Sequence, residues 1–149
     1  MKLGVDGKVV IVTGASRGIG AAIAKSLGHH GATVIVNYHK NREKAEAVLV
    51  QIKENGGDGI LFQADVRDAD AVNAMVETTI TTYGKVDVLV NNANIDFPIK
   101  PFVALTWEEI NAKITGEIQA LYNCSQAVLR DMTPRKRGKL IFISSSLSR

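Results

Sequence analysis

The chain has 149 residues, 46% of them hydrophobic and 22% charged, which is enough apolar material for one domain with a buried core and excludes a disordered chain. No apolar run approaches the roughly 20 residues of a membrane-spanning helix, and the amino terminus lacks an apolar targeting segment, so a soluble protein is expected. The net charge of +3 comes largely from one short run, 135–139, which has no interleaved aromatic residues and therefore does not favour nucleic-acid binding.

Along the chain, short and fully apolar runs alternate with helical stretches. This pattern is typical of parallel strands joined by crossover helices, in a sheet covered on both faces. The predicted elements are, in order, a strand at 9–12, a helix at 18–30, a strand at 33–36, a helix at 42–55, a strand at 59–62, a helix at 68–83, a strand at 86–90, a helix at 107–132 and a strand at 139–143.

Several helix ends carry recognisable caps. Asp68 can accept hydrogen bonds from the free amides that begin the third helix. Thr106 and Glu109 have the spacing of a capping box at the start of the fourth. Glycines stand where a left-handed residue would end the first three helices: Gly31, Gly56 and Gly84.

The strongest local signal is the run Thr13–Gly20, which follows an apolar strand and opens a helix. Glycines at this corner permit a tight turn and let backbone amides reach a diphosphate, which the helix amino terminus stabilises. We therefore expect this loop to bind a dinucleotide. The predicted contacts within it are Gly14, Ser16, Arg17, Gly18, Ile19 and Gly20.

The glycine spacing resembles that of the short-chain dehydrogenase/reductase family, and three further motifs agree in the same order. Asp65-Val66 follows the third strand, where the family aspartate reaches the adenine, and Asn91-Asn92-Ala93 follows the fourth. The run 138–145 resembles the fifth strand, which ends at the catalytic serine. The resemblance implies a Rossmann-like, doubly wound α/β sheet with strand order 3-2-1-4-5. It also implies that the parent protein lies near the 3-oxoacyl-carrier-protein reductase branch of the family.

The cofactor predicted is NADP(H) rather than NAD(H). In NAD-binding members of this fold an acidic residue about 20 positions beyond the glycine loop holds the ribose 2′-hydroxyl. The corresponding stretch, 37–42, has no carboxylate, while Arg17 together with Lys40 or Arg42 can attract a 2′-phosphate. Contacts at the adenosine end are expected from Tyr38, His39 and Lys40.

The resemblance also implies the chemistry. In the family a serine polarises the substrate carbonyl, a tyrosine transfers its proton, a lysine lowers the pKa of that tyrosine, and hydride passes to or from the nicotinamide. The strand register places the serine at Ser145. None of the three tyrosines is followed by a lysine at the fourth position, so the family's Tyr-x-x-x-Lys is missing and this chain alone is expected to show no dehydrogenase turnover.

Two positions depart from the family pattern. Asn94 replaces the glycine after Asn91-Asn92-Ala93, a change that a left-handed backbone would tolerate. In the helix after Trp107 the family usually carries an asparagine that serves the proton relay. That position falls on Ile114 or, if Gly116 sets the register, on Lys113. The relay is therefore expected to run differently, or the parent protein to be an atypical catalyst.

These observations predict one dinucleotide-binding domain over residues 1–149. A strand at 139–143 would need a neighbour on its outer edge, so we expect further polypeptide there. The single cysteine, Cys124, and the absence of a metal-binding motif favour the reducing cytoplasm. The predicted function is NADP-dependent reduction of a carbonyl, or oxidation of an alcohol, by a homodimer or homotetramer. The alternative is a binding module or degenerate reductase that holds the dinucleotide without chemistry.

Overall fold

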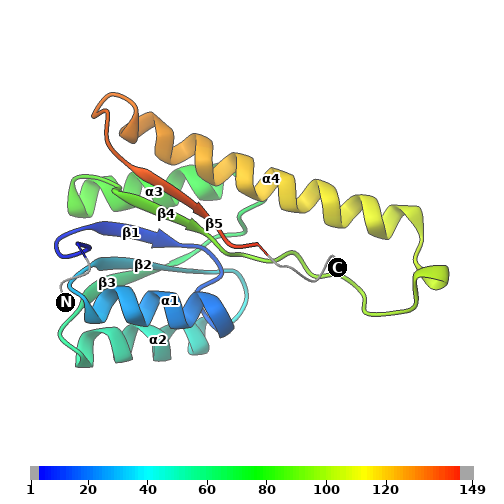
Figure 1. Ribbon diagram of the computed structural model, residues 1–149, viewed down its shortest axis with the longest axis horizontal. Coiled ribbons are helices and arrows are strands. Elements are labelled where there is room, and N and C mark those ends of the chain that lie inside the picture. The colour runs from blue at the N-terminus through cyan, green and yellow to red at the C-terminus, as the bar shows by residue number, and fades with distance from the viewer. Residues whose placement is uncertain (1–3, 145–149) are drawn as a thin grey trace.

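In the computed structural model, which describes residues 4–144, a parallel sheet lies between two pairs of helices (Figure 1). The strand order is β3-β2-β1-β4-β5, as the resemblance implied. The strands are β1 (Val9–Val12), β2 (Thr33–Tyr38), β3 (Asp58–Gln63), β4 (Val88–Asn91) and β5 (Lys139–Phe142). Every pairing within this sheet is parallel.

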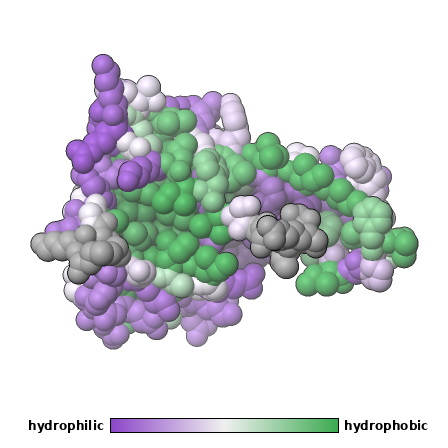
Figure 2. Space-filling model, in the orientation of Figure 1, coloured by the Kyte–Doolittle hydropathy of each residue, from purple (hydrophilic) through white to green (hydrophobic). Residues whose placement is uncertain are grey.

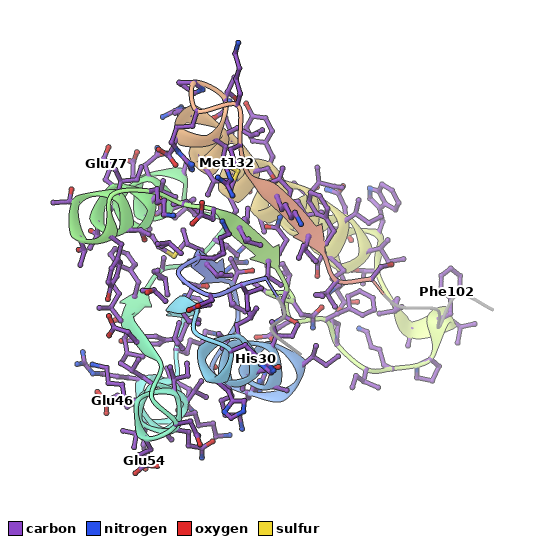
Figure 3. The ribbon with its side chains drawn as sticks, turned by 60° about the vertical axis from the view of Figure 1, so that its left-hand side comes forward. His30, Glu46, Glu54, Glu77, Phe102 and Met132 are labelled. Carbon is purple, nitrogen blue, oxygen red and sulfur yellow. The ribbon has the colours of Figure 1, made fainter. Side chains whose placement is uncertain are left out.

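The helices cover the sheet from both sides. Helices α1 (Gly18–His29) and α2 (Arg42–Glu54) lie on one face, and α3 (Ala69–Tyr83) and α4 (Trp107–Met132) lie on the other. Figure 3 shows the same division, with Glu46 and Glu54 marking α2 and with Glu77 and Met132 marking the opposite layer. A short 3-10 helix, η1 (Phe102–Ala104), precedes α4, which runs out past the sheet.

The predicted caps are present. Asp68 accepts hydrogen bonds from the amides of Asp70 and Ala71, and Thr106 and Glu109 form the reciprocal capping box. The glycines at positions 31, 56 and 84 all have positive φ. These local signals explain why the sequence placed the helices to within one residue at either end.

The core is divided by the alternation of side chains along the strands. Val9 and Ile11 of β1 point toward α3 and α4, while Val10 and Val12 point toward α1 and α2. All four are at most 4% exposed. The first strand is therefore buried on both faces and fixes the corner that follows it.

Strand β4 begins later than predicted. Val86 donates its N–H to the Asp131 carboxylate of α4, at 3.0 Å, and its carbonyl accepts from Arg135. Because these backbone groups are bonded to side chains, Val86 does not pair with the neighbouring strands, and β4 begins at Val88. Arg135 is also paired with Asp131 at 2.7 Å, so the first residue of the basic run at 135–139 is anchored to α4.

One part of the sheet is left uncovered. Beside α1, the face of β4 and β5 forms a hollow of about 550 Å³ with an apolar floor (Figure 2). Ile141 and Ile143 remain 43% and 39% exposed there. The cationic side chains of Lys8, Arg137 and Lys139 contribute to its lining. The described helices therefore cover this face only as far as α1.

Candidate functional site

The sheet order creates a switch point between two neighbouring strands. β1 and β4 are paired in register, with Val12 opposite Val90, and the chain leaves β1 toward α1 and leaves β4 toward α4 on the opposite face. In open α/β sheets, ligands bind outside the carboxyl ends of the strands at such a point. The glycine loop and Asn91–Ala93 are the segments that meet there.

Glycine is required at the corner by close contacts. Gly14 has φ of +61°, and a Cβ there would lie 2.8 Å from the Cα of Ala93. A Cβ at Gly20 would collide with the Asn92 side chain and with the Gly14 carbonyl. The loop after β1 and the loop after β4 therefore pack backbone against backbone.

Hydrogen bonds lock these two loops together. The Asn92 side-chain amide donates to the carbonyls of Thr13 and Gly14, at 3.0 and 3.1 Å. In return the Thr13 hydroxyl accepts from the amides of Asn92 and Ala93, at 2.9 and 3.0 Å. The Asn92 side chain thus supports the conformation of the glycine loop. The Thr13 hydroxyl was not among the predicted site residues.

A second residue that the sequence did not single out supports the loop from β2. Asn37 is 1% exposed, and its side-chain oxygen accepts from the Gly14 amide at 3.1 Å. Its side-chain nitrogen donates to the carbonyls of Phe62 and Ala64, at 3.4 and 3.2 Å. Asn37 stands in the acid-free stretch, but it faces inward and ties β1 to β3. The only sequence signal for this role is a short amide at the end of an apolar strand.

The start of α1 is suited to an anion. Its N-cap residue, Arg17, makes no side-chain capping bond, and its first turn has no acidic residue. Gly18 has φ of +55°, and a Cβ there would meet nothing within 4 Å. Free amides at the positive end of a helix, beside open space, fit a phosphate group. Ser16 is half-buried beside this turn, while Ile19 is 64% exposed.

The nearby cations differ in their availability. Arg17 is exposed and makes no ion pair with any residue in the range 4–144. Lys40 is 76% exposed, and its one ion pair with another described residue is a 3.9 Å contact with the exposed Asp96. By contrast, Arg42 is bonded to Glu46 at 2.6 Å. Of the two alternatives for a second cation, the geometry favours Lys40.

Tyr38 and His39, at the end of β2, have different surroundings. The Tyr38 side chain is 3% exposed and packs in the core beneath α1 and α2. His39 is 47% exposed, with its Nε2 atom 3.7 Å from the Asp65 carboxylate. His39 therefore offers more surface to a ligand than Tyr38 does.

Asp65 is held by a neighbour in the sequence. The Arg67 guanidinium binds its carboxylate, with the closest contact at 2.6 Å, and lowers the pKa of Asp65 to about 2. Val66 is buried, and its carbonyl accepts from Asn123 of α4 at 3.1 Å. Asp65 is thus fixed and ionised at the carboxyl edge, where the adenine contact was predicted.

Asn91, at the end of β4, is 5% exposed, and its side-chain nitrogen has no partner among the described residues. Its carbonyl accepts from the amide of Ile143, which extends the pairing with the last strand. This pairing brings Ser144 to the same edge. The predicted catalytic residue, Ser145, lies outside the described residues.

The two departures from the family pattern meet in space. Lys113 donates to the Asn94 side chain and to the Ile95 carbonyl, both at 2.6 Å, whereas Ile114 is 54% exposed. Helical phase thus selects Lys113 as the residue that faces the β4 edge. Asn94 does not have a positive φ, so tolerance of a left-handed backbone is not what accommodates this residue. It serves as a hydrogen-bond acceptor instead.

Cys124 does not belong to the site. It is 1% exposed on the buried face of α4, and burial raises the pKa of its thiol to about 12, which suits a packing residue. No helix within the described part of the chain is long and apolar enough to cross a membrane.

Comparison with known proteins gives consistent relatives. Residues 8–149 match the family model described as short chain dehydrogenase. A 3-oxoacyl-(acyl-carrier-protein) reductase, FabG, of Staphylococcus aureus is 41% identical over 140 residues, which make up 93% of this chain and 56% of that protein. Versicolorin reductase stcU of Emericella nidulans is 53% identical over 90 residues, or 60% of this chain and 34% of that protein.

Two solved structures are also similar. A metagenomic short-chain oxidoreductase in complex with NADP has a TM-score of 0.85 and 38% identity, over 95% of this chain and 63% of that one. A short chain dehydrogenase from Burkholderia cenocepacia in complex with NADP has a TM-score of 0.84 and 38% identity, over 96% and 57% of the two chains. The chain thus spans little more than half of most of these relatives.

Proposed function

Because this chain belongs to the short-chain dehydrogenase family, we propose that it forms the NADP(H)-binding part of an oxidoreductase acting on a carbonyl or alcohol. The observation that carries the proposal is the corner at Gly14 and Gly18, where the amides of α1 are left uncapped beside open space. The diphosphate would be held by this turn, and the adenosine by His39 and Asp65. When bound, the nicotinamide supplies or takes the hydride.

Preference for the 2′-phosphate is assigned to Arg17 and Lys40. Both cations are exposed, and the buried Asn37 leaves no carboxylate at the end of β2 to repel a phosphate. A guanidinium and an ammonium close to one phosphate favour the doubly charged ligand over a ribose hydroxyl. The complexes of the two structural relatives with NADP support the same choice.

Equilibrium titration with NADPH and NADH tests this assignment. We expect the chain to bind NADPH more tightly, and Arg17→Ala to reduce the ratio of the two affinities about tenfold, since one charge-assisted contact is lost. Arg130→Ala, which removes an exposed cation near the end of α4, is the matched control and should leave the ratio unchanged. Equal or tighter binding of NADH by the unaltered chain would contradict the assignment.

The catalytic step is proposed to need residues beyond these 149. The open apolar face of β4 and β5 is the kind of surface that a further helix covers in a doubly wound sheet, and the FabG relative is longer. The chain contains no Tyr-x-x-x-Lys. We expect the purified chain to bind NADPH yet to oxidise none of it with a 3-oxoacyl thioester or a simple ketone, as followed by absorbance. Sustained carbonyl reduction would contradict this.

Self-association is proposed to use α4. Apolar side chains recur on this helix at intervals of four and seven residues, so that they share one exposed face. We call this face the α4 stripe; it consists of Trp107, Ile114, Ile118, Tyr122 and Leu129, which are 41–68% exposed. A stripe of this kind can pair with its own copy about a two-fold axis.

Sedimentation velocity tests the stripe. Ile118→Glu is expected to shift a dimer to monomer, because a carboxylate would be buried at the centre of the pairing. Val50→Glu is the matched control, since Val50 of α2 is 52% exposed, compared with 62% for Ile118, but lies on the other side of the sheet. A dimer that survives Ile118→Glu would exclude this surface.

Cytoplasmic localisation stays a prediction.

A further inference from the structure

The segment that leaves β4 is hydrogen-bonded to two side chains from successive turns of α4. Glu117 accepts the Ile95 N–H at 3.0 Å, and Lys113 donates to the Ile95 carbonyl at 2.6 Å. The N–H and the carbonyl of Ile95 are therefore both hydrogen-bonded to side chains of α4. Lys113 also donates to Glu117 at 2.5 Å, which ties the two gripping residues to each other.

The Lys113 ammonium has all its donors engaged. An ammonium carries three N–H groups, and Lys113 has three acceptors, namely the Asn94 side chain, the Ile95 carbonyl and Glu117. Its side chain is 25% exposed. No proton is left to serve a passing ligand, so the geometry points to a residue that positions the loop rather than one that carries protons.

Packing of the Ile95 side chain also fixes this segment. A Cβ at Gly116 of α4 would lie 3.2 Å from Cγ2 of Ile95, so the isoleucine side chain rests directly on the helix backbone. Gly116 itself is buried. Ile95 is thus fixed at three points, through its amide, its carbonyl and its side chain, all by residues 113–117 of α4.

Two residues connect Ile95 to the glycine corner. Ala93, two positions before Ile95, packs against Gly14, and Asn92 bonds to the Thr13 and Gly14 carbonyls. β2 and β4 lie on opposite sides of β1. A dinucleotide whose diphosphate sits at the corner and whose 2′-phosphoadenosine lies toward β2 must extend its nicotinamide half toward β4.

We propose that Lys113 and Glu117 are positioning residues that set the β4 loop against the nicotinamide half of the dinucleotide. This inference rests on the proposed function. It predicts a selective effect, because loosening Ile95 disturbs the β4 side of the corner and leaves Arg17, His39 and Asp65 on the β2 side in place.

The test compares two ligands that differ only in the nicotinamide ring, NADPH and 2′-phospho-ADP-ribose. For Lys113→Met we expect the dissociation constant of NADPH to rise about tenfold, as for the loss of a hydrogen-bonded charge. The dissociation constant of 2′-phospho-ADP-ribose should stay within about twofold of the unaltered value. Lys113→Arg, which retains donors and charge, should recover most of the NADPH affinity.

Glu117→Ala provides a second, independent variant and should show the same selectivity. Lys53→Met is the matched control for the chemical change, since Lys53 is exposed in the last turn of α2, and should alter neither ligand. Unchanged NADPH binding, or equal weakening of both ligands, would overturn the proposal. An unaltered chain that binds neither ligand would refute dinucleotide binding itself, and the positioning role with it.

Discussion

Replacing Gly18 by alanine is expected to weaken NADPH binding by about a hundredfold or more, because a methyl group would occupy the space assigned to the diphosphate. In the protein alone that methyl group has room, since a Cβ at Gly18 meets nothing within 4 Å. The substitution therefore removes space from the ligand rather than from the fold. Isothermal titration calorimetry with NADPH measures the loss directly.

The backbone strain of this substitution has its own control. Gly18 has φ of +55°, and an L-residue there costs about 1–2 kcal/mol. Gly84, the C-cap of α3, has φ of +84° and is equally unobstructed, so Gly84→Ala carries a comparable strain far from the corner. If both variants lose NADPH affinity to the same extent, the loss reflects general destabilisation, and the diphosphate site would have to be placed elsewhere.

The second large effect is on stability. Asn37→Ala is expected to lower the free energy of unfolding by about 3 kcal/mol, because the partly buried Gly14 amide and the Phe62 and Ala64 carbonyls lose their side-chain partner at once. Urea denaturation followed by circular dichroism gives this difference. The unfolding slope should be unchanged, since the exposed area on unfolding stays nearly the same.

Asn55→Ala supplies the comparison for Asn37→Ala. The Asn55 side chain also donates a hydrogen bond, to the Gln51 carbonyl at 2.7 Å, but it is exposed at the end of α2. Water can replace that bond, so we expect a loss of less than about 1 kcal/mol. Similar losses for both variants would show that the bonds of Asn37 do not stabilise the sheet beyond an ordinary surface contact.

The fold was largely predictable because its signals are local. Apolar runs such as 9–12, the capping box at Thr106 and the left-handed glycines each depend on residues a few positions apart. The sheet order followed from the resemblance. The corner at Gly14 and Gly18 lies at the strand-to-helix turn that the motif implied.

What escaped prediction depends on partners far away in the chain. The late start of β4 needs Asp131, 45 positions from Val86, and the inward orientation of Asn37 needs carbonyls 25 and 27 positions later. The choice between Lys113 and Ile114 required the phase of α4 against β4. No short-range pattern encodes these contacts, so they emerge only when the elements are packed together.

The bare flank of β4 and β5 has a practical consequence for solution work. Its valines and isoleucines form a second exposed apolar surface, distinct from the α4 stripe, through which copies of the chain can self-associate as the protein concentration rises. An Ile141→Glu background would make this flank polar. In that background, pairing that persists at high protein concentration and is lost on Ile118→Glu can be ascribed to the long helix.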